Sequence, residues 1–478
     1  MTAAPLASGP QGPDALRPLL DTVLDALREG TQARGGPLPA GGPEAVAARM
    51  RQALGEALPA AGEPDALHRL VRALAAGTAD PADPLCAAHL HTPPLAVAAA
   101  ADLAATVLNP SLDSWDQAPA ASALEALVTR ALAQEIGAAD ALVTTGGTES
   151  NHLAVLLARE AHPGVRLVTA AGAHHSLPRA AWLLGLPEPV VLPTPAGTLD
   201  PTTLDDALTH LPGPLLVAAT AGTTDAGLID PLPEIADLCA AHGARLHVDA
   251  AYGGGLLFSD RHRPLLDGLT RAHTVTLDLH KLGWQPVAAG LLAVRDAPDL
   301  AVLGHRADYL NADDDTEAGL PDLLGRSLRT TRRPDILKIA VTLKTLGRHG
   351  IGRLVDQVCA LAQDFAATVE AHPAFELHDR PTISTVLFRP TGAGDDAVAA
   401  VRRRLLHDGR AVIGRAALDG RLWLKVTLLN PHTRPVDLTT LLKLVEAATA
   451  TEATAPTAPT APATPATRAD LPEGHTPA

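Results

Sequence analysis

Short apolar runs rich in β-branched residues alternate with helical stretches through the middle of the chain. The runs lie at residues 141–143, 165–169, 190–192, 214–219, 245–249, 274–277 and 290–294. Helical periodicity fills the intervals between them, for example at residues 199–211 and 232–241. Strands that are apolar on both faces and alternate with helices are typical of a mostly parallel sheet covered by helices. We therefore predict an α/β fold around a mostly parallel central sheet.

Polar segments follow five of these predicted strands. They are TTGG (144–147), AHHS (173–176), AGTTDAG (221–227), DAAYGG (249–254) and DLHK (278–281). In open α/β sheets, ligands bind at the carboxyl ends of the strands. Five polar segments at one edge of the sheet therefore predict a single binding site there.

Lys281 is the first lysine of the chain, although arginine is plentiful before it. Arginine pairs with acids and phosphates as well as lysine does, but only a primary amine condenses with an aldehyde to a Schiff base. Asp249 ends an apolar run, where a buried carboxylate can keep a ring nitrogen protonated. Together the two residues indicate pyridoxal phosphate as the cofactor. For Lys281 taken alone, a solvated surface lysine after a strand is the alternative.

The segment TTGGTES lies between the strand at 141–143 and a helix expected at 151–161. A strand, a glycine turn and a helix present backbone N–H groups and the positive end of the helix dipole to a phosphate. Thr148 and Ser150 can add hydroxyl donors or simply cap the helix. Neither GxxxxGK[ST] nor GxGxxG is present, so no nucleotide-binding fingerprint is met.

Charge, cysteine content and missing motifs argue against several classes of function. The formal net charge is −15 without any lysine block, which argues against nucleic acid or an anionic membrane as a partner. Cys86, Cys239 and Cys359 are far apart and in no CxxC spacing, so we expect neither a disulfide framework nor a zinc site. The sequence contains no HExxH motif, which argues against a metal hydrolase. The chain shows no signal-peptide pattern and no long apolar run, so we expect a cytoplasmic protein.

Composition and periodicity divide the chain into five predicted regions. Residues 1–12 are expected to be disordered, residues 13–90 to form helices outside the main sheet, and residues 91–345 to form the large cofactor-binding domain. Residues 346–448 are expected to form a small C-terminal α+β domain. Residues 449–478, rich in Pro, Ala and Thr, are expected to be a disordered tail.

Within these regions, helices are expected at residues 14–29, 43–58, 64–76, 330–346 and 351–371. The polar stretch 109–122 is either a surface connector or a substrate-entry loop. The Asp-rich stretch 296–328 has the length and polarity of a mobile lid.

HVDAAYGG followed by DLHK resembles the group II pyridoxal phosphate-dependent amino acid decarboxylases. The resemblance extends over about residues 85–445, in the family's order, to WDQAPA, TTGGTESN, AHHS, TAGTTDAGLIDP, SLRTTRR and LKVTLLNP. It implies fold type I, that of the aspartate aminotransferase superfamily. It also implies a homodimer in which the N-terminal helices pack across the partner and the active site lies at the subunit interface.

The resemblance also implies roles for individual residues. Lys281 would hold the cofactor covalently, Asp249 would bind its ring nitrogen, and His174 would stack on the ring opposite Ala251, where only a small side chain fits. The phosphate would be bound by Gly147, Thr148 and His280, with Thr223 or Thr224 nearby. For His174, a hydrogen-bonded loop histidine is the alternative.

One position departs from the family's pattern. Relatives acting on aromatic amino acids carry a loop tyrosine, the proton donor, about nine residues before the RR pair, and Leu323 stands at that spacing here. The donor of the α-proton is therefore open, with His174, Lys281 or a residue of the partner subunit as candidates.

TTRRPDILK and LKVTLLNP resemble most the branch that acts on diamino acids. The resemblance thus implies decarboxylation of L-2,4-diaminobutyrate, ornithine or lysine to a diamine and carbon dioxide. A carboxylate would bind the second amine, and Asp116 or Asp313 to Asp315 could supply it. The alternatives are a decarboxylase of glutamate, aspartate or an aromatic amino acid, a decarboxylation followed by oxidation, and a non-catalytic scaffold that retains the fold.

Overall fold

Seven strands form the central sheet of the protein, whose computed structural model describes residues 4–305, 307 and 310–454. The order across the sheet is β1-β7-β6-β5-β4-β2-β3, with β7 antiparallel to both of its neighbours and the other pairs parallel. The strands are β1 (Asp140–Thr144), β2 (Arg166–Ala170), β3 (Val190–Leu192), β4 (Leu215–Thr220), β5 (Arg245–Ala250), β6 (Thr274–Asp278) and β7 (Gly290–Val294). The predicted α/β fold with a mostly parallel sheet is confirmed.

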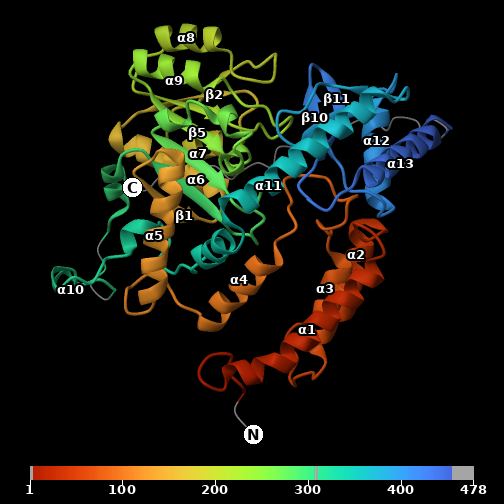
Figure 1. The fold of residues 1–478 in the computed structure, drawn as a ribbon, viewed down its shortest axis with the longest axis horizontal. Coiled ribbons are helices and arrows are strands. Elements are labelled where there is room, and N and C mark those ends of the chain that lie inside the picture. The colour runs from red at the N-terminus through yellow and green to blue at the C-terminus, as the bar shows by residue number, and fades with distance from the viewer. Residues whose placement is uncertain (1–3, 306, 308–309, 455–478) are drawn as a thin grey trace, which may run out of the picture.

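Helices cover both faces of this sheet (Figure 1). Along β4, Val217 packs into the apolar cluster on one face, whereas Leu216 and Ala218 pack into the cluster on the other. The first cluster includes residues of α5 (Pro119–Ile136), α8 (Pro201–His210) and α9 (Leu232–Ala241), and the second includes residues of α6 (Gly147–Ala161) and α7 (Ser176–Leu183). Burial on both faces explains why the strands are continuous apolar runs.

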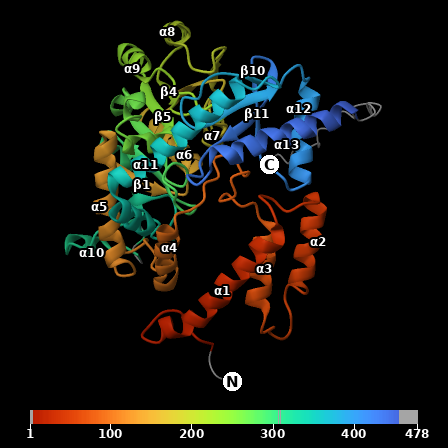
Figure 2. The same ribbon diagram turned by 45° about the vertical axis from the view of Figure 1, so that its right-hand side comes forward.

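Three N-terminal helices stand apart from the sheet (Figures 1 and 2). They are α1 (Gly12–Arg34), α2 (Gly42–Leu54) and α3 (Ala66–Gly77), and α4 (Ala96–Leu108) then packs against α11 in the body of the protein. Residues 4–11 form an irregular turn in which the Gly12 N–H donates to the Gly9 carbonyl at 3.0 Å. Residues 4–11 carry no helix or strand, residues 1–3 lie outside the described residues, and disorder over residues 1–12 stays a prediction.

The C-terminal domain holds a separate antiparallel sheet of four strands in the order β10-β11-β9-β8. Its elements are β8 (Phe375–Leu377), β9 (Thr385–Pro390), α12 (Asp395–His407), β10 (Gly414–Leu418), β11 (Arg421–Thr427) and α13 (Pro435–Thr454). This matches the predicted small α+β domain. However, α13 continues six residues into the predicted tail, because residues 449–454 include two alanines and no glycine or proline to end the helix. The rest of that tail, residues 455–478, lies outside the described residues.

The long helix α11 (Ile336–Glu370) joins the two domains. Gly347 interrupts it with φ 66° and ψ 172°, a conformation that glycine adopts without a Cβ clash. The break predicted between the helices at 330–346 and 351–371 is confirmed at Gly347, although the first of these helices begins only at Ile336. Neither α11 nor any other helix in the described part of the chain is both long and apolar enough to cross a membrane.

The segment between β7 and α11 is the predicted lid. It carries η4 (Ala297–Leu303), α10 (Asp313–Glu317) and η5 (Leu324–Arg326). Arg326 donates to both carboxylate oxygens of Asp140 at 2.6 and 3.1 Å, and the buried Arg332 donates to both of Glu125 at 3.0 and 3.1 Å. These contacts fix the end of the segment to the large domain, and the mobility of the remainder stays a prediction.

Three short 3₁₀ helices link β5 to β6, and the first packs against the loop that carries Lys281. They are η1 (Gly253–Phe258), η2 (Arg263–Leu266) and η3 (Leu269–Arg271). A Cβ atom on Gly255 would lie 2.3 Å from Leu282 Cβ and 2.4 Å from the Leu282 carbonyl oxygen. Leu282 follows Lys281 directly, so glycine at position 255 allows this loop to approach η1 closely.

We expect Gly255→Ala to lower the free energy of unfolding by about 1–3 kcal/mol, because the added methyl group must displace Leu282. Urea unfolding followed by circular dichroism measures the change. Gly394→Ala is the matched control, since a Cβ atom there meets nothing within 4 Å. Equal unfolding midpoints for the two variants would contradict the packing argument.

Candidate active site

The carboxyl ends of the parallel strands surround one cavity of about 260 Å³. All five polar segments contribute to its wall, as the sequence predicts. The lining residues are Leu90, Thr145, Gly146, Gly147, Thr148, Asn151, His174, Thr220, Gly222, Thr224, Asp249, Ala251, Tyr252, Asp278, His280 and Lys281.

Seven of the eight predicted site residues line this cavity, and Thr223 does not. The Thr223 hydroxyl instead accepts the Leu228 N–H at 3.0 Å and stabilises the turn of its own loop. Thr224, which the sequence left as the alternative, lines the cavity. The structure therefore brings Thr224 to the site in place of Thr223.

The amine of Lys281 lies against a carboxylate that sequence reasoning missed. Lys281 Nζ is 3.0 Å from Asp278 Oδ2, in an ion pair three residues apart, and the Asp278 side chain is 2% exposed. The other oxygen, Asp278 Oδ1, is buried without a hydrogen-bond partner among the described residues. The available signal was an acid at the end of an apolar strand, three residues before the lysine.

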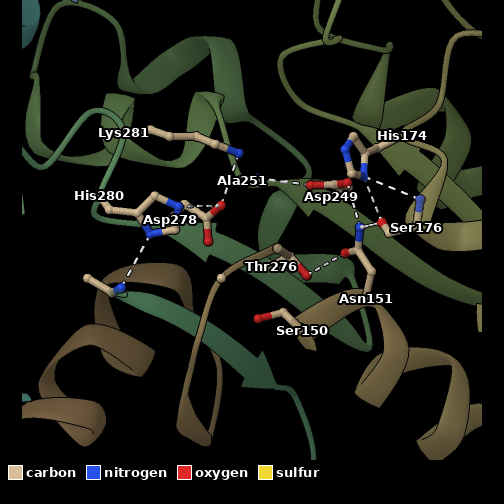
Figure 3. A network of polar contacts seen from close by, with 12 residues as sticks. Ser150, Asn151, His174, Ser176, Asp249, Ala251, Thr276, Asp278, His280 and Lys281 are labelled. Carbon is tan, nitrogen blue, oxygen red and sulfur yellow. Dashed lines mark hydrogen bonds and ion pairs between the residues drawn. The ribbon is translucent and has the colours of Figure 1, made fainter. Parts of the chain in front are cut away.

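Asp249 lies at the carboxyl end of β5 and is held by two uncharged donors. Its Oδ1 accepts the Ala251 N–H at 3.0 Å, and its Oδ2 accepts from Asn151 Nδ2 at 2.8 Å. The side chain is buried at the cavity wall (Figure 3). Since no cationic side chain among the described residues is hydrogen-bonded to Asp249, it can bind a protonated ring nitrogen from the cavity.

Two histidines of the cavity wall are neutral at pH 7. Burial lowers the pKa of His174 and of His280 below the ordinary value for the imidazole. His280 Nδ1 accepts the Ala289 N–H at 3.3 Å, so its proton is on Nε2, which lies 3.5 Å from Asp278 Oδ2. His174 Nδ1 is 2.8 Å from the Ser176 hydroxyl. Both imidazoles are thereby oriented by their neighbours.

The start of α6 forms a cradle that a side chain would fill. A Cβ atom on Gly147 would lie 2.9 Å from Ala251 Cβ and 3.1 Å from Asp278 Oδ2, and one on Gly146 would lie 3.0 Å from His280 Cε1. Gly146, Gly147 and Thr148 at the amino end of α6 line the cavity, so this end of the helix can receive a phosphate. Together with the amine of Lys281 and the carboxylate of Asp249, this cradle fits the aldehyde, phosphate and ring nitrogen of pyridoxal phosphate.

Ser150 does not take part in this cradle. Its hydroxyl lies 2.7 Å from Thr144 Oγ1 and donates to the Leu291 carbonyl at 3.1 Å, so it joins α6 to β1 and β7. The suggestion that Ser150 donates to a phosphate or caps α6 is therefore wrong. Thr148 lines the cavity and remains available for a phosphate.

The small domain supports the cavity wall at two places. The Tyr252 hydroxyl lies 2.9 Å from Ser384 Oγ and 3.1 Å from Thr385 Oγ1, at the start of β9. Lys425 of β11 donates to the Thr224 carbonyl at 2.9 Å, and burial lowers the pKa of this lysine. Sequence reasoning missed both contacts, because each joins residues more than 130 positions apart.

The acidic loop residues that were expected to bind the second amine of the substrate do not line this cavity. Asp116 is exposed and accepts from the Ser114 hydroxyl at 2.6 Å, and Asp313 to Asp315 lie on the exposed helix α10. Leu323 packs with Leu112 and Ala118 in a small apolar cluster. The chain thus has an apolar contact at the position where aromatic-acid relatives have the loop tyrosine.

Comparison with known proteins agrees with this geometry. A family model described as "Pyridoxal-dependent decarboxylase conserved domain" matches residues 48–391. The chain is 40% identical over 372 residues to a protein of Rhizobium meliloti (strain 1021) named L-2,4-diaminobutyrate decarboxylase, covering 74% of this chain and 75% of that one. It is 31% identical over 385 residues to a protein of the same name from Acinetobacter baumannii, covering 72% and 76% of the two chains.

A solved structure gives the same result for the fold. It is the glutamate decarboxylase domain of diaminobutyrate-pyruvate transaminase and L-2,4-diaminobutyrate decarboxylase from Vibrio parahaemolyticus. It superimposes with a TM-score of 0.82 at 29% sequence identity, over 94% of this chain and 98% of that one.

We expect borohydride reduction of the protein loaded with pyridoxal phosphate to attach the cofactor permanently to Lys281. Among the described residues, Lys281 is the lysine that lines the cavity. Peptide mapping by mass spectrometry identifies the labelled residue. Lys281→Arg, which keeps the charge beside Asp278 but cannot condense with an aldehyde, should lose the label. Lys344→Arg should keep it, and a label on any other lysine contradicts the assignment.

Proposed function

The chain belongs to the family of pyridoxal-dependent decarboxylases, and from that premise we propose that it converts L-2,4-diaminobutyrate to a diamine and carbon dioxide. The observation that carries the proposal is its 40% identity with a protein named for this reaction, combined with the cavity that holds Lys281 and Asp249. The protein is a pyridoxal phosphate-dependent carboxy-lyase of amino acid metabolism. We further propose that it acts in diamine biosynthesis in the cytoplasm.

Pyridoxal phosphate would be held by the residues of the cavity wall. Lys281 would bind its aldehyde carbon, Asp249 its ring nitrogen, and the amino end of α6 with Thr148 and His280 its phosphate. When bound, the cofactor supplies an electron sink for the electron pair left by the departing carbon dioxide. Asp249 would keep the ring nitrogen protonated, since the Asn151 and Ala251 donors hold its carboxylate at the cavity wall.

Lys281 is our proposed donor of the final proton to the α-carbon. Its Nζ lines the cavity and lies 3.0 Å from Asp278 Oδ2, and burial lowers the pKa of the other candidate, His174. Asp278, at 3.0 Å, orients the ammonium and can exchange a proton with it. Leu323 packs away from the cavity, which supports the view that the residue at this loop position is not the proton donor.

Both carboxylates of the cavity wall have assigned partners, Lys281 for Asp278 and the cofactor ring nitrogen for Asp249. Among the described residues, the lining includes two carboxylates, Asp249 and Asp278, and no arginine. Asp116 and Asp313 to Asp315 lie outside this cavity, so we propose that any of them that binds the second amine does so from the partner subunit.

We propose a homodimer with the active site at its interface. The support is α1, which stands apart from the sheet in both views and exposes apolar side chains (Figures 1 and 2). Leu19, Leu24 and Leu27 are 44%, 57% and 44% exposed. Covering such side chains with a second copy of the chain would remove them from water.

Among L-2,4-diaminobutyrate, ornithine, lysine, glutamate, aspartate and tyrosine, we expect the first to have the highest kcat/KM, by at least about tenfold over the acidic and aromatic substrates. Mass spectrometry of the amine product and of carbon dioxide measures each reaction. Lys281→Arg serves as the inactive control. Turnover of glutamate with none of the three diamino acids would contradict the proposal.

We expect the wild-type protein to be a dimer by size-exclusion chromatography with light scattering. Leu24→Asp should shift the equilibrium toward the monomer, because it places a charge in the proposed interface. Leu58→Asp is the control, since Leu58 is 90% exposed in the loop between α2 and α3. A monomeric wild type, or an identical shift in both variants, contradicts the proposed interface.

A further inference from the structure

Asn151 lies at the cavity wall and is the centre of a buried hydrogen-bond network (Figure 3). Its Nδ2 lies 2.8 Å from Asp249 Oδ2 and 2.9 Å from Ser176 Oγ. Its Oδ1 lies 2.8 Å from Thr276 Oγ1 and 3.0 Å from His247 Nε2. The side chain is fully buried, so these four contacts satisfy the amide without water.

The charge of Asp249 determines which way this amide points. A carboxylate only accepts hydrogen bonds, so the NH₂ group of Asn151 must face Asp249, and its carbonyl oxygen must face His247. A carbonyl oxygen also only accepts, which requires a proton on His247 Nε2. His247 Nδ1 lies 2.9 Å from Thr274 Oγ1, and a hydrogen bond with the Thr274 backbone raises the pKa of this ring against the larger effect of burial.

His247 has one ring proton under physiological conditions. It is completely buried on β5, and burial lowers its pKa from 6.5 to about 4. At pH 7 the ring is therefore neutral, and its single proton is fixed on Nε2 by the Asn151 carbonyl oxygen. The His247 side chain does not line the cavity, and its hydrogen-bond partners are Thr274 and Asn151.

The second hydrogen atom of the Asn151 amide determines the proton position on His174. Ser176 Oγ accepts from Asn151 Nδ2 at 2.9 Å, so its own hydrogen is free to donate to His174 Nδ1 at 2.8 Å. The Ser176 N–H also points to this nitrogen, at 3.3 Å. His174 Nδ1 is therefore an acceptor, and the proton of the neutral ring is on Nε2.

We infer that His247 is a positioning residue, which holds the Asn151 amide so that one donor faces Asp249 and another fixes the tautomer of His174 through Ser176. Asp249, expected at the ring nitrogen of the cofactor, and His174, expected on the ring face, are thus both oriented by the Asn151 amide. This inference rests on the cofactor site of the proposed function and not on its substrate.

Two substitutions of His247 separate hydrogen bonding from packing. His247→Leu removes the donor to Asn151 Oδ1, whereas His247→Gln keeps an N–H donor. We expect the leucine variant to bind pyridoxal phosphate about tenfold more weakly, the effect of one hydrogen bond next to a charged group, and the glutamine variant to stay within about threefold of the wild type. Titration of the apoprotein followed by absorbance measures the dissociation constant.

A double-mutant cycle tests whether His247 acts through Asn151. In an Asn151→Leu background, His247→Leu should change the dissociation constant by less than about twofold, because the amide that it positions is gone. Equal weakening by His247→Leu and His247→Gln, or additive effects of the two leucine substitutions, overturns the inference. A role in packing alone gives that result.

Neutron diffraction from crystals of the wild-type protein tests the same inference without any variant. We expect a deuteron on Nε2 of His247 and of His174, and none on Nδ1 of either ring. A deuteron on His247 Nδ1 overturns the inference. None of these measurements uses an amino acid substrate, so a failure of the proposed substrate leaves them unaffected, and their failure leaves the substrate assays unaffected.

Discussion

The buried carboxylate of Asp249 is the constraint on which the rest of the site depends. An ionised acid removed from water costs free energy unless donors compensate it, and the compensation here comes from the Ala251 N–H and the Asn151 amide. Asn151 can reach Asp249 because α6 crosses the sheet beside β5 and β6. The fold therefore does more than carry the site: α6 supplies both the donor for Asp249 and the open amino end for a phosphate.

The architecture of the sheet could be predicted from the sequence because each strand is buried on both faces. Such strands read as short apolar runs, and all seven runs became strands with boundaries within one residue of those expected. The convergence of five polar loops on one cavity followed from the same pattern, since parallel strands end at one edge. Lys281, Asp249 and Thr148 followed from their chemistry and their place at strand ends, whereas Gly147, His174, Ala251 and His280 came from the family's motifs.

The features that the sequence did not reveal depend on long-range geometry. Asn151 lies 98 positions from Asp249, and nothing in TTGGTESN distinguishes it from the helix residues around it. Thr223 and Thr224 are adjacent, and only the turn closed by Leu228 decides which of them faces the cavity.

Two buried carboxylates at the ends of neighbouring strands have different partners, and this difference gives them different chemistry. Asp249 contacts amide donors whose charge does not change, so it can neutralise a cation that enters from the cavity. Asp278 instead pairs with the Lys281 ammonium at 3.0 Å, a group that must lose and regain a proton whenever its amine reacts. Because the loop position of Leu323 has no side chain that can donate a proton, the Asp278–Lys281 pair is the part of the described chain best arranged to return the proton to the substrate.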